Sequence, residues 1–176
     1  MSTYKRQKAV RCGTFEGSSL EDRSYVTGDF DGNLAVWDLE EDRPVEDVRG
    51  AHREMINCVA GAEGGSIVSG GREGEVRVWD RRDMRRCVLN MVDRNTSHDA
   101  WAVSMRGQEV CAGYSNGDIR LFDMRAGAAS WETSIPGGGL THLTLLGDKR
   151  LTGAGAGGLA SVWDLQTRHK TLGYTR

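Results

Sequence analysis

The residues that first suggest a chemical function in this sequence are three glycines, Gly153, Gly155 and Gly158, in the stretch RLTGAGAGGLASVWDL. Their G-x-G-x-x-G spacing is typical of a dinucleotide-binding turn, in which glycines let the backbone approach a pyrophosphate. Such a turn follows a strand and opens a helix. The residues after Gly158 read LASVWDL, which is typical of a strand, so the role of the glycines depends on the rest of the chain.

The glycines belong to a segment that occurs four times. The copies are TGDFDGNLAVWD from Thr27, SGGREGEVRVWD from Ser69, AGYSNGDIRLFD from Ala112 and TGAGAGGLASVWD from Thr152. Their closing aromatic residues lie 42, 43 and 41 residues apart. A repeat near 42 residues with a Trp-Asp ending predicts the four-stranded blades of a β-propeller.

Each copy is expected to form a strand, a tight turn and a second strand. The turn pairs are Asp31-Gly32, Glu73-Gly74, Asn116-Gly117 and Gly157-Gly158. Such pairs predict two-residue hairpins, in which both positions take a positive φ. Apolar residues alternate after each turn and the aromatic residue points to the opposite face, so both faces of each sheet should be covered. The apolar runs before the hairpins should form inner strands, and the more polar segments after each Trp-Asp should form outer ones.

We therefore predict an all-β fold, a β-propeller of about four blades with four antiparallel strands each. Residues 1–8 are expected to form a basic tail or strand start, and the repeats to span about 9–50, 51–93, 94–136 and 137–176. Closing a ring of four blades needs about 90° per blade, so we expect a partial or truncated propeller. The pattern leaves open whether the arc closes, dimerises or stays open.

Composition narrows the function classes. The net charge of −2 offers no basic face for nucleic acid, and no apolar run reaches the length of a membrane span. The four cysteines form no C-x-x-C pair, which indicates a reducing, intracellular compartment. The four histidines lack zinc-site spacing and no nucleophile motif occurs. We therefore expect no metal, no cofactor and no catalytic residue.

The four repeats resemble the WD40-repeat family, whose fold is the β-propeller, over residues 9–176. This resemblance implies a hydrogen-bonded structural network in a blade, formed by His, Ser or Thr, Asp and Trp. The second repeat would supply His52, Ser69, Trp79 and, in the Asp position, Glu73. The first would supply Thr27, Asp31 and Trp37, without an upstream histidine.

The same comparison predicts weaker networks in the other two repeats. The third repeat carries Ala112, Asn116 and Phe122, so its network is expected to be broken. The fourth carries Thr152, Gly157 and Trp163, with one extra residue in the turn.

The resemblance further implies that loops on one face of the ring meet protein partners. The residues before the turn acids are the candidate partner-binding residues Phe30, Arg72 and Ser115. Phe30 and Arg72 are the expected anchors, because aromatic residues and arginine dominate binding hot spots. The alternative for Phe30 is packing against a neighbouring loop.

Within the family, the stretches CAGYSNGDIRLFDMR and WETSI are most similar to WD-repeat assembly factors of axonemal dynein, over the central blades. That resemblance implies a non-enzymatic cytoplasmic scaffold, associated with cilia or flagella. Its implied partners are dynein chains and a chaperone complex with RuvB-like ATPases and prefoldin-like subunits. The alternatives are a WD40 adaptor of another assembly, such as a ubiquitin-ligase receptor or chromatin reader, and a nucleotide-binding enzyme that uses Gly153 to Gly158.

Overall fold

The structure, a computed structural model, describes residues 8–15, 24–41, 43–62, 64–92, 98–147 and 149–175. Sixteen β-strands and no helix occur in these residues, which confirms the all-β expectation. A helix long and apolar enough to cross a membrane is likewise missing from these ranges. The predicted tail at residues 1–8 lies outside them except for Lys8.

The first two repeats each form one antiparallel sheet whose strands pair in chain order. The first sheet contains β1 (Val10–Thr14), β2 (Ser24–Asp29), β3 (Leu34–Asp38) and β4 (Arg43–Val48). The second contains β5 (Ile56–Ala62), β6 (Ser66–Gly71), β7 (Val76–Asp80) and β8 (Leu89–Met91).

The last two repeats form sheets of the same topology. The third contains β9 (Ala100–Arg106), β10 (Glu109–Tyr114), β11 (Asp118–Asp123) and β12 (Ala128–Ser134). The fourth contains β13 (Leu140–Leu145), β14 (Arg150–Gly155), β15 (Leu159–Asp164) and β16 (His169–Thr175).

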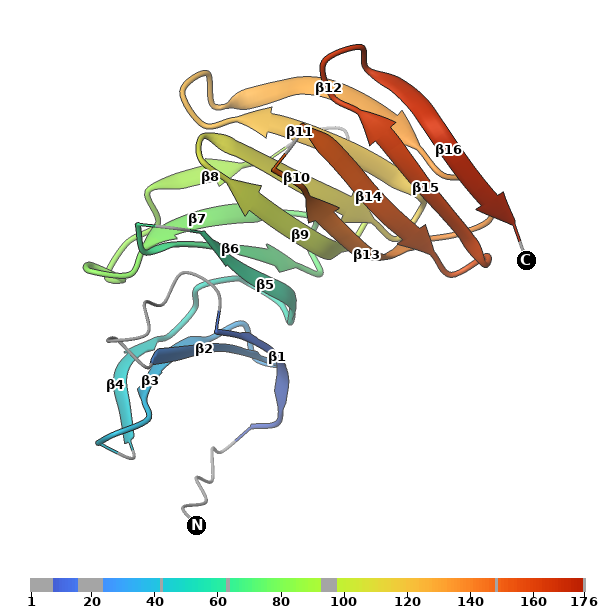
Figure 1. Cartoon of the computed structure of the whole chain (residues 1–176). Helices are drawn as coiled ribbons and strands as arrows, with labels where there is room; N and C mark the ends of the chain where they lie inside the picture. The colour runs from blue at the N-terminus through green and yellow to red at the C-terminus, as the bar shows by residue number, and fades with distance from the viewer. Residues whose placement is uncertain are drawn as a thin grey trace.

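Successive sheets stack in an arc, with the first and fourth sheets at its two ends (Figure 1). The first strands of the sheets, β1, β5, β9 and β13, contact one another in that order. These are the strands that the apolar runs before the hairpins predicted as inner strands. The segments after each Trp-Asp form the outer strands, as expected.

Three apolar cores lie between neighbouring sheets, because side chains alternate along each strand. Trp79 on β7 faces back into the core shared with the first sheet, where Leu34 and Val36 lie. Val76 and Val78, on the other face of the same strand, join the core shared with the third sheet. The prediction that the aromatic residue and the apolar pair point to opposite faces is therefore confirmed.

A glycine at each junction lets the next sheet approach closely. A methyl group added at Gly28 would lie 2.6 Å from Ile56 Cγ2, and one at Gly113 would lie 2.7 Å from Leu140 Cβ. Gly70 stands in the same place in the second sheet, where an added methyl group would lie 3.0 Å from Ala100 Cβ. The first strand of each following sheet thus packs on bare backbone.

The hairpin turns differ from the prediction. In the first sheet, Asp29 N donates to Asn33 O and Gly32 N donates to Asp29 O, so the loop has three residues. Gly32 has a φ of 78°, whereas Asp31 is not among the residues with positive φ. This is a β-turn followed by a glycine in the left-handed region, not a two-residue hairpin. One glycine with positive φ suffices, which explains why Asp, Glu and Asn are tolerated before it.

The fourth repeat has no inserted residue, which corrects a second expectation. Leu151 pairs with Trp163 across the hairpin, as Ile67 pairs with Trp79 in the second sheet. Two residues further along, Gly153 therefore occupies the place of Ser69. Matching the Thr-Gly dipeptides of the first and fourth repeats shifted this segment by one residue.

Candidate functional site

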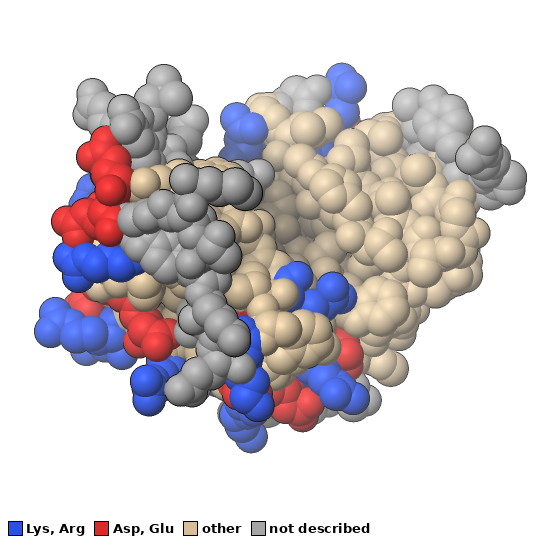
Figure 2. Space-filling view, turned by 90° about the horizontal axis from the view of Figure 1, so that it is seen from below, with Lys and Arg blue, Asp and Glu red and all other residues tan. Residues whose placement is uncertain are grey.

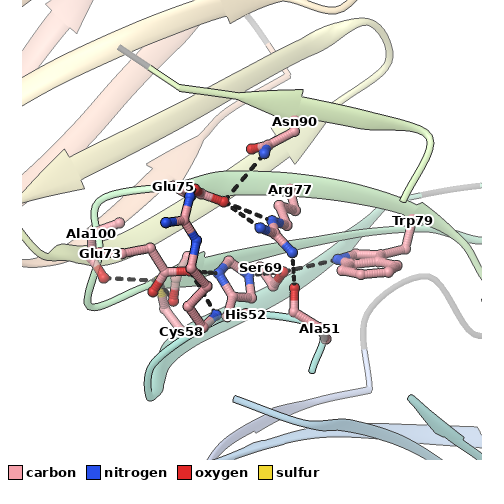
Figure 3. Close-up of polar contacts among 12 residues, drawn as sticks. Ala51, His52, Cys58, Ser69, Glu73, Glu75, Arg77, Trp79, Asn90 and Ala100 are labelled. Atoms are coloured by element: carbon pink, nitrogen blue, oxygen red, sulfur yellow. Dashed lines mark hydrogen bonds and ion pairs between the residues drawn. The ribbon is translucent and has the colours of Figure 1, made fainter. Parts of the chain in front are cut away.

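The second sheet holds a chain of polar contacts that begins at a buried histidine (Figure 3). His52 Nδ1 lies 2.7 Å from Glu73 Oε1, and His52 Nε2 lies 2.8 Å from Ser69 Oγ. Trp79 Nε1 donates to the same Ser69 Oγ at 2.9 Å. The structure thus brings together all four residues that the sequence assigned to this network.

Separate elements position these four side chains. His52 lies in the connection from β4 to β5, where its N–H donates to Gly32 O of the preceding hairpin at 2.9 Å. Ser69 lies on β6 and Trp79 on β7, while Glu73 lies in the turn between those strands. The network therefore ties the first hairpin, the connection between the sheets and the second sheet to one another.

The Glu73, His52 and Ser69 contacts have the order of a hydrolase charge relay, but their surroundings are unlike those of a nucleophile. Ser69 is fully buried, and its Oγ already accepts the Trp79 N–H. A nucleophilic hydroxyl must reach a substrate carbonyl, whereas this one faces the core between two sheets. The arrangement satisfies polar groups inside the core.

The pKa of Glu73 lies below its ordinary value. Burial raises this pKa, but the hydrogen bond with His52 and backbone N–H donors outweigh the effect of burial. Because the charged carboxylate is the form that the network favours, protonating Glu73 weakens the network.

The first sheet forms a shorter version of the network. Trp37 Nε1 donates to Thr27 Oγ1 at 2.8 Å. Asp31 lies apart from this pair, since its carboxylate forms an ion pair with Lys8 at 3.4 Å. This repeat has no upstream histidine, and among the described residues no side chain bridges Asp31 and the Thr27 hydroxyl.

The third and fourth sheets fill the same place with apolar contacts. Phe122 replaces the tryptophan and is buried beside Ala112. In the fourth sheet the indole of Trp163 lies over Gly153, where an added methyl group would be 3.2 Å from its ring. Thr152, expected in the network, instead directs its hydroxyl to Thr144 O at 3.5 Å.

A second polar cluster beside His52 was missed in the sequence (Figure 3). Glu75 is buried, and its carboxylate contacts Arg77, Arg53 at 3.1 Å and Asn90 at 3.2 Å. Arg77 also donates to Ala51 O. Burial raises the pKa of Glu75, but its hydrogen bond and charge interaction with Arg77 outweigh that effect and lower it. The available signal was the spacing of Glu75 and Arg77, two residues apart in extended chain at the start of β7, which directs both side chains to one face of the sheet.

The candidate partner-binding residues lie in equivalent hairpin loops of three neighbouring sheets. Phe30 is 48% exposed in the loop between β2 and β3. Arg72 lies between β6 and β7 and forms an ion pair with Glu54 at 3.6 Å. Ser115 lies between β10 and β11, and its N–H donates to Asp99 O. Because the sheets share one topology, these loops form one edge of the arc, which we call the hairpin edge.

Four further residues come to the hairpin edge through β-bulges that the sequence does not reveal. In each sheet, the pairing between the inner strand and the second strand shifts by one residue. The shift lies close to the hairpin turn that follows the second strand. The extra residues are Arg11, Asn57, Trp101 and Thr141. A bulge re-aims a side chain relative to the sheet. Trp101, 39% exposed, lies over Gly139 and beside Ser115 O.

Charge is distributed unevenly over the arc. Figure 2 shows charged side chains gathered beside the first sheet and a largely uncharged surface over the fourth, with a hollow between them. The sequence agrees, because residues 133–147 and 151–163 contain no Asp, Glu, Lys or Arg. The two ends of the arc therefore offer different chemistry to a partner.

The glycines of the G-x-G-x-x-G stretch do not form a dinucleotide site. Gly153 and Gly155 lie on β14, and Gly158 ends the turn to β15 with a φ of 81°. A strand follows where the motif requires a helix. Of the three glycines, Gly153 packs closely on its neighbours, since a methyl group added there would lie 3.1 Å from Leu140 Cδ2. Among the described residues no cluster of His, Cys, Asp and Glu has the arrangement of a metal site.

Comparisons with known proteins agree with this architecture. The family model "WD domain, G-beta repeat" matches residues 45–80. Dynein axonemal assembly factor 10 of Xenopus tropicalis is 40% identical over 97% of the chain, and the human protein of that name is 40% identical over the same share. The Chlamydomonas reinhardtii protein of that name is 35% identical over 76% of the chain.

The chain spans about half the length of the curated relatives it matches, 52% and 53% for these first two. In fold it is similar to the solved WD40 repeats of RRP9, with a TM-score of 0.85 at 15% identity. That match covers 98% of this chain and 52% of the solved one.

Proposed function

The chain belongs to the WD40-repeat family, and we propose that it acts as a protein-binding scaffold in the assembly of axonemal dynein arms. The observation that supports this role is its 40% identity, over 97% of its length, to proteins named dynein axonemal assembly factor 10. The protein of that name from Chlamydomonas reinhardtii, 35% identical over 76% of the chain, adds to this support.

The proposed scaffold is non-catalytic. The Glu73, His52 and Ser69 constellation is enclosed between sheets, with the Ser69 hydroxyl fully buried. The glycine stretch that suggested a cofactor forms a hairpin. Both features favour a structural role for the residues that had the types and spacing for chemistry.

Partner binding is assigned in this proposal to the hairpin edge. Phe30 and Arg72 offer an exposed aromatic ring and an exposed guanidinium, the residue types that dominate hot spots. Ser115 lies beside the exposed ring of Trp101, so the edge continues onto the third sheet. The proposed partners are dynein chains and a chaperone complex with RuvB-like ATPases and prefoldin-like subunits, and the proposed location is the cytoplasm of ciliated or flagellated cells.

Affinity capture from such cells tests the proposal. The tagged chain, incubated with cytoplasmic extract, is expected to recover dynein heavy chains or RuvB-like ATPases, identified by mass spectrometry. Phe30→Ala and Arg72→Ala, combined in one chain, should reduce the recovery of these proteins. Val88→Ala, which removes an apolar side chain that is 61% exposed next to β8, is the matched control and should leave the recovery unchanged. Recovery of neither class of protein contradicts the assembly role.

A further inference from the structure

The connection between β7 and β8 differs from its counterparts in the other sheets. It spans residues 81–88, whereas the equivalent connections span residues 39–42, 124–127 and 165–168. We call residues 80–86, which read DRRDMRR, the arginine loop. This loop lies at the end of β7 opposite to the turn that holds Arg72, so it is separate from the hairpin edge.

Contacts within the chain hold the backbone of the arginine loop in place. Arg81 N donates to Gly65 O at 2.8 Å, and Asp83 N donates to Asp80 O at 3.0 Å. Met84 is fully buried and packs in the core between the first two sheets. A partner therefore meets a loop whose backbone is already ordered, so binding costs mainly the freedom of the side chains.

The two aspartates of the loop are engaged locally. Asp80 Oδ1 accepts the backbone N–H of Arg82 at 2.9 Å, and Asp83 Oδ1 accepts the Nε–H of Arg85 at 2.9 Å. Arg82 and Arg86 are exposed, and neither forms an ion pair with a carboxylate in the described part of the chain. Four arginines and two aspartates give the loop a net charge of +2.

A groove of about 340 Å³ adjoins the arginine loop. Residues 46–49, from the end of β4, line one side of it, and Met84 and Arg85 line the other. Since Met84 and Arg85 belong to the loop, the groove opens directly onto it. The side chains of Arg49 and Arg85 are 87% and 88% exposed, so both guanidinium groups reach solvent at the groove.

The chemistry of this surface favours separate carboxylates over a continuous chain of phosphates. A guanidinium group presents a planar fork of N–H donors that matches a carboxylate. Glu46 and Asp47 in the groove would repel a nucleic acid strand, because such a strand carries a negative charge at every nucleotide. A peptide can set neutral residues opposite these two acids and its own carboxylates opposite the arginines.

We propose that the arginine loop and the adjoining groove bind an acidic peptide segment of a partner protein, in which glutamate or aspartate alternates with neutral residues. Carboxylates of the segment pair with Arg82 and Arg86 of the loop and with Arg49 at the groove. Arg85, already paired with Asp83, borders the site. This site is independent of the role in dynein assembly, because it is defined by the charge and shape of this surface alone.

The test uses the purified 176-residue chain and a fluorophore-labelled peptide of about twelve residues, blocked at both ends, in which glutamate and serine alternate. Fluorescence anisotropy at low salt should show saturable binding. The same peptide with glutamine in place of glutamate should bind at least about tenfold more weakly. Raising NaCl from about 50 mM to about 500 mM should weaken binding of the glutamate peptide about tenfold, because salt screens exposed charges.

Matched arginine variants locate the site. Arg82→Gln should weaken binding of the glutamate peptide about threefold, and Arg82→Gln combined with Arg86→Gln about tenfold, as expected for exposed ion pairs. Arg125→Gln is the control, because Arg125 is exposed and Asp123 accepts its backbone N–H as Asp80 accepts that of Arg82. It removes the same charge from the equivalent turn of the third sheet and should leave binding unchanged.

The exposed positions of these arginines separate binding from folding. All of these variants should keep the urea midpoint of the unchanged chain, because surface substitutions alter stability little. No saturable binding of the glutamate peptide, equal binding of the glutamine peptide, or equal losses in Arg82→Gln and Arg125→Gln would each overturn the proposal. Tighter binding of a single-stranded oligonucleotide of equal charge would overturn it as well, since the surface would then select nucleic acid.

Discussion

Trp79 donates its indole N–H to the hydroxyl of Ser69 at 2.9 Å, in a site where both side chains are buried. The same hydroxyl contacts His52, so one oxygen atom serves two buried groups. In the first sheet, by contrast, Thr27 contacts a tryptophan that is only half-buried. The two sheets therefore offer a matched pair of buried hydroxyls whose tryptophan partners differ in burial.

Ser69→Ala should destabilise the chain more than Thr27→Ala. The first change leaves the Trp79 N–H and His52 Nε2 buried without a partner, which should lower the free energy of unfolding by about 2–4 kcal/mol in total. The second change leaves the half-buried Trp37 N–H, which water can reach, and should lower the free energy of unfolding by about 1 kcal/mol. Urea unfolding followed by tryptophan fluorescence measures both. Equal losses in the two variants would show that the Ser69 network adds nothing beyond one hydrogen bond.

Acid should weaken the chain through Glu73 and Glu75, whose pKa values both lie below the ordinary value for glutamate. A lowered folded-state pKa contributes stability that is present above the ordinary pKa and is lost as the pH falls through the lowered one. The urea midpoint should therefore fall between about pH 5 and pH 3. Glu73→Gln should make this dependence shallower, whereas Glu40→Gln, at an exposed position, should not. A parallel dependence in all three proteins would refute the assignment to Glu73.

Gly113→Ala and Ala154→Gly should both destabilise the chain, for different physical reasons. Gly113→Ala places a methyl group 2.7 Å from Leu140 Cβ and should cost about 1–3 kcal/mol through overpacking. Ala154 holds the equivalent place on β14, one residue after Gly153. Ala154→Gly should cost about 0.5–1 kcal/mol because glycine is more flexible in the unfolded chain. Thermal unfolding should show a lower midpoint for both variants, with the larger drop for Gly113→Ala. A stabilising Gly113→Ala would disprove the close approach.

Cys12, on the inner strand β1, should be slow to react with iodoacetamide in the folded chain. Burial raises its pKa from 9.0 to about 11, so the thiolate fraction at pH 8 falls about a hundredfold. Mass spectrometry of digests taken over time, from native chain and from chain in urea, compares the two rates. A native rate close to the rate in urea would mean that Cys12 is not buried as described.

The fold could be predicted from the sequence because the same pattern of residues occurs four times along the chain. The period near 42 residues, the Trp-Asp ending and the alternating apolar pairs together predicted sheets covered on both faces. His52, Ser69, Glu73 and Trp79 could also be predicted to meet, since all four match one family pattern. The contribution of these four residues to stability depends on how deeply they are buried, and the family pattern does not predict their burial.

The pairing register of the strands was the part of the structure that the sequence did not predict. Thr152 looks like Thr27 because Thr-Gly precedes both hairpins, yet the strand pairing aligns Gly153 with Thr27. A shift of one residue in a strand moves every side chain to the opposite face, so local similarity was a poor guide here. Asn57 and Trp101 escaped notice for a related reason. A bulge depends on pairing with the neighbouring strand and leaves no signal of its own in the inner strand.

The junction glycines have a consequence for the curvature of the arc. Gly28, Gly70 and Gly113 let neighbouring sheets approach closely along their inner strands, while large side chains such as Trp79 and Phe122 hold them apart further out. Neighbouring sheets therefore meet at an angle, and the angles at successive junctions curve the arc. The bend of this molecule is thus set by about one small residue in each repeat.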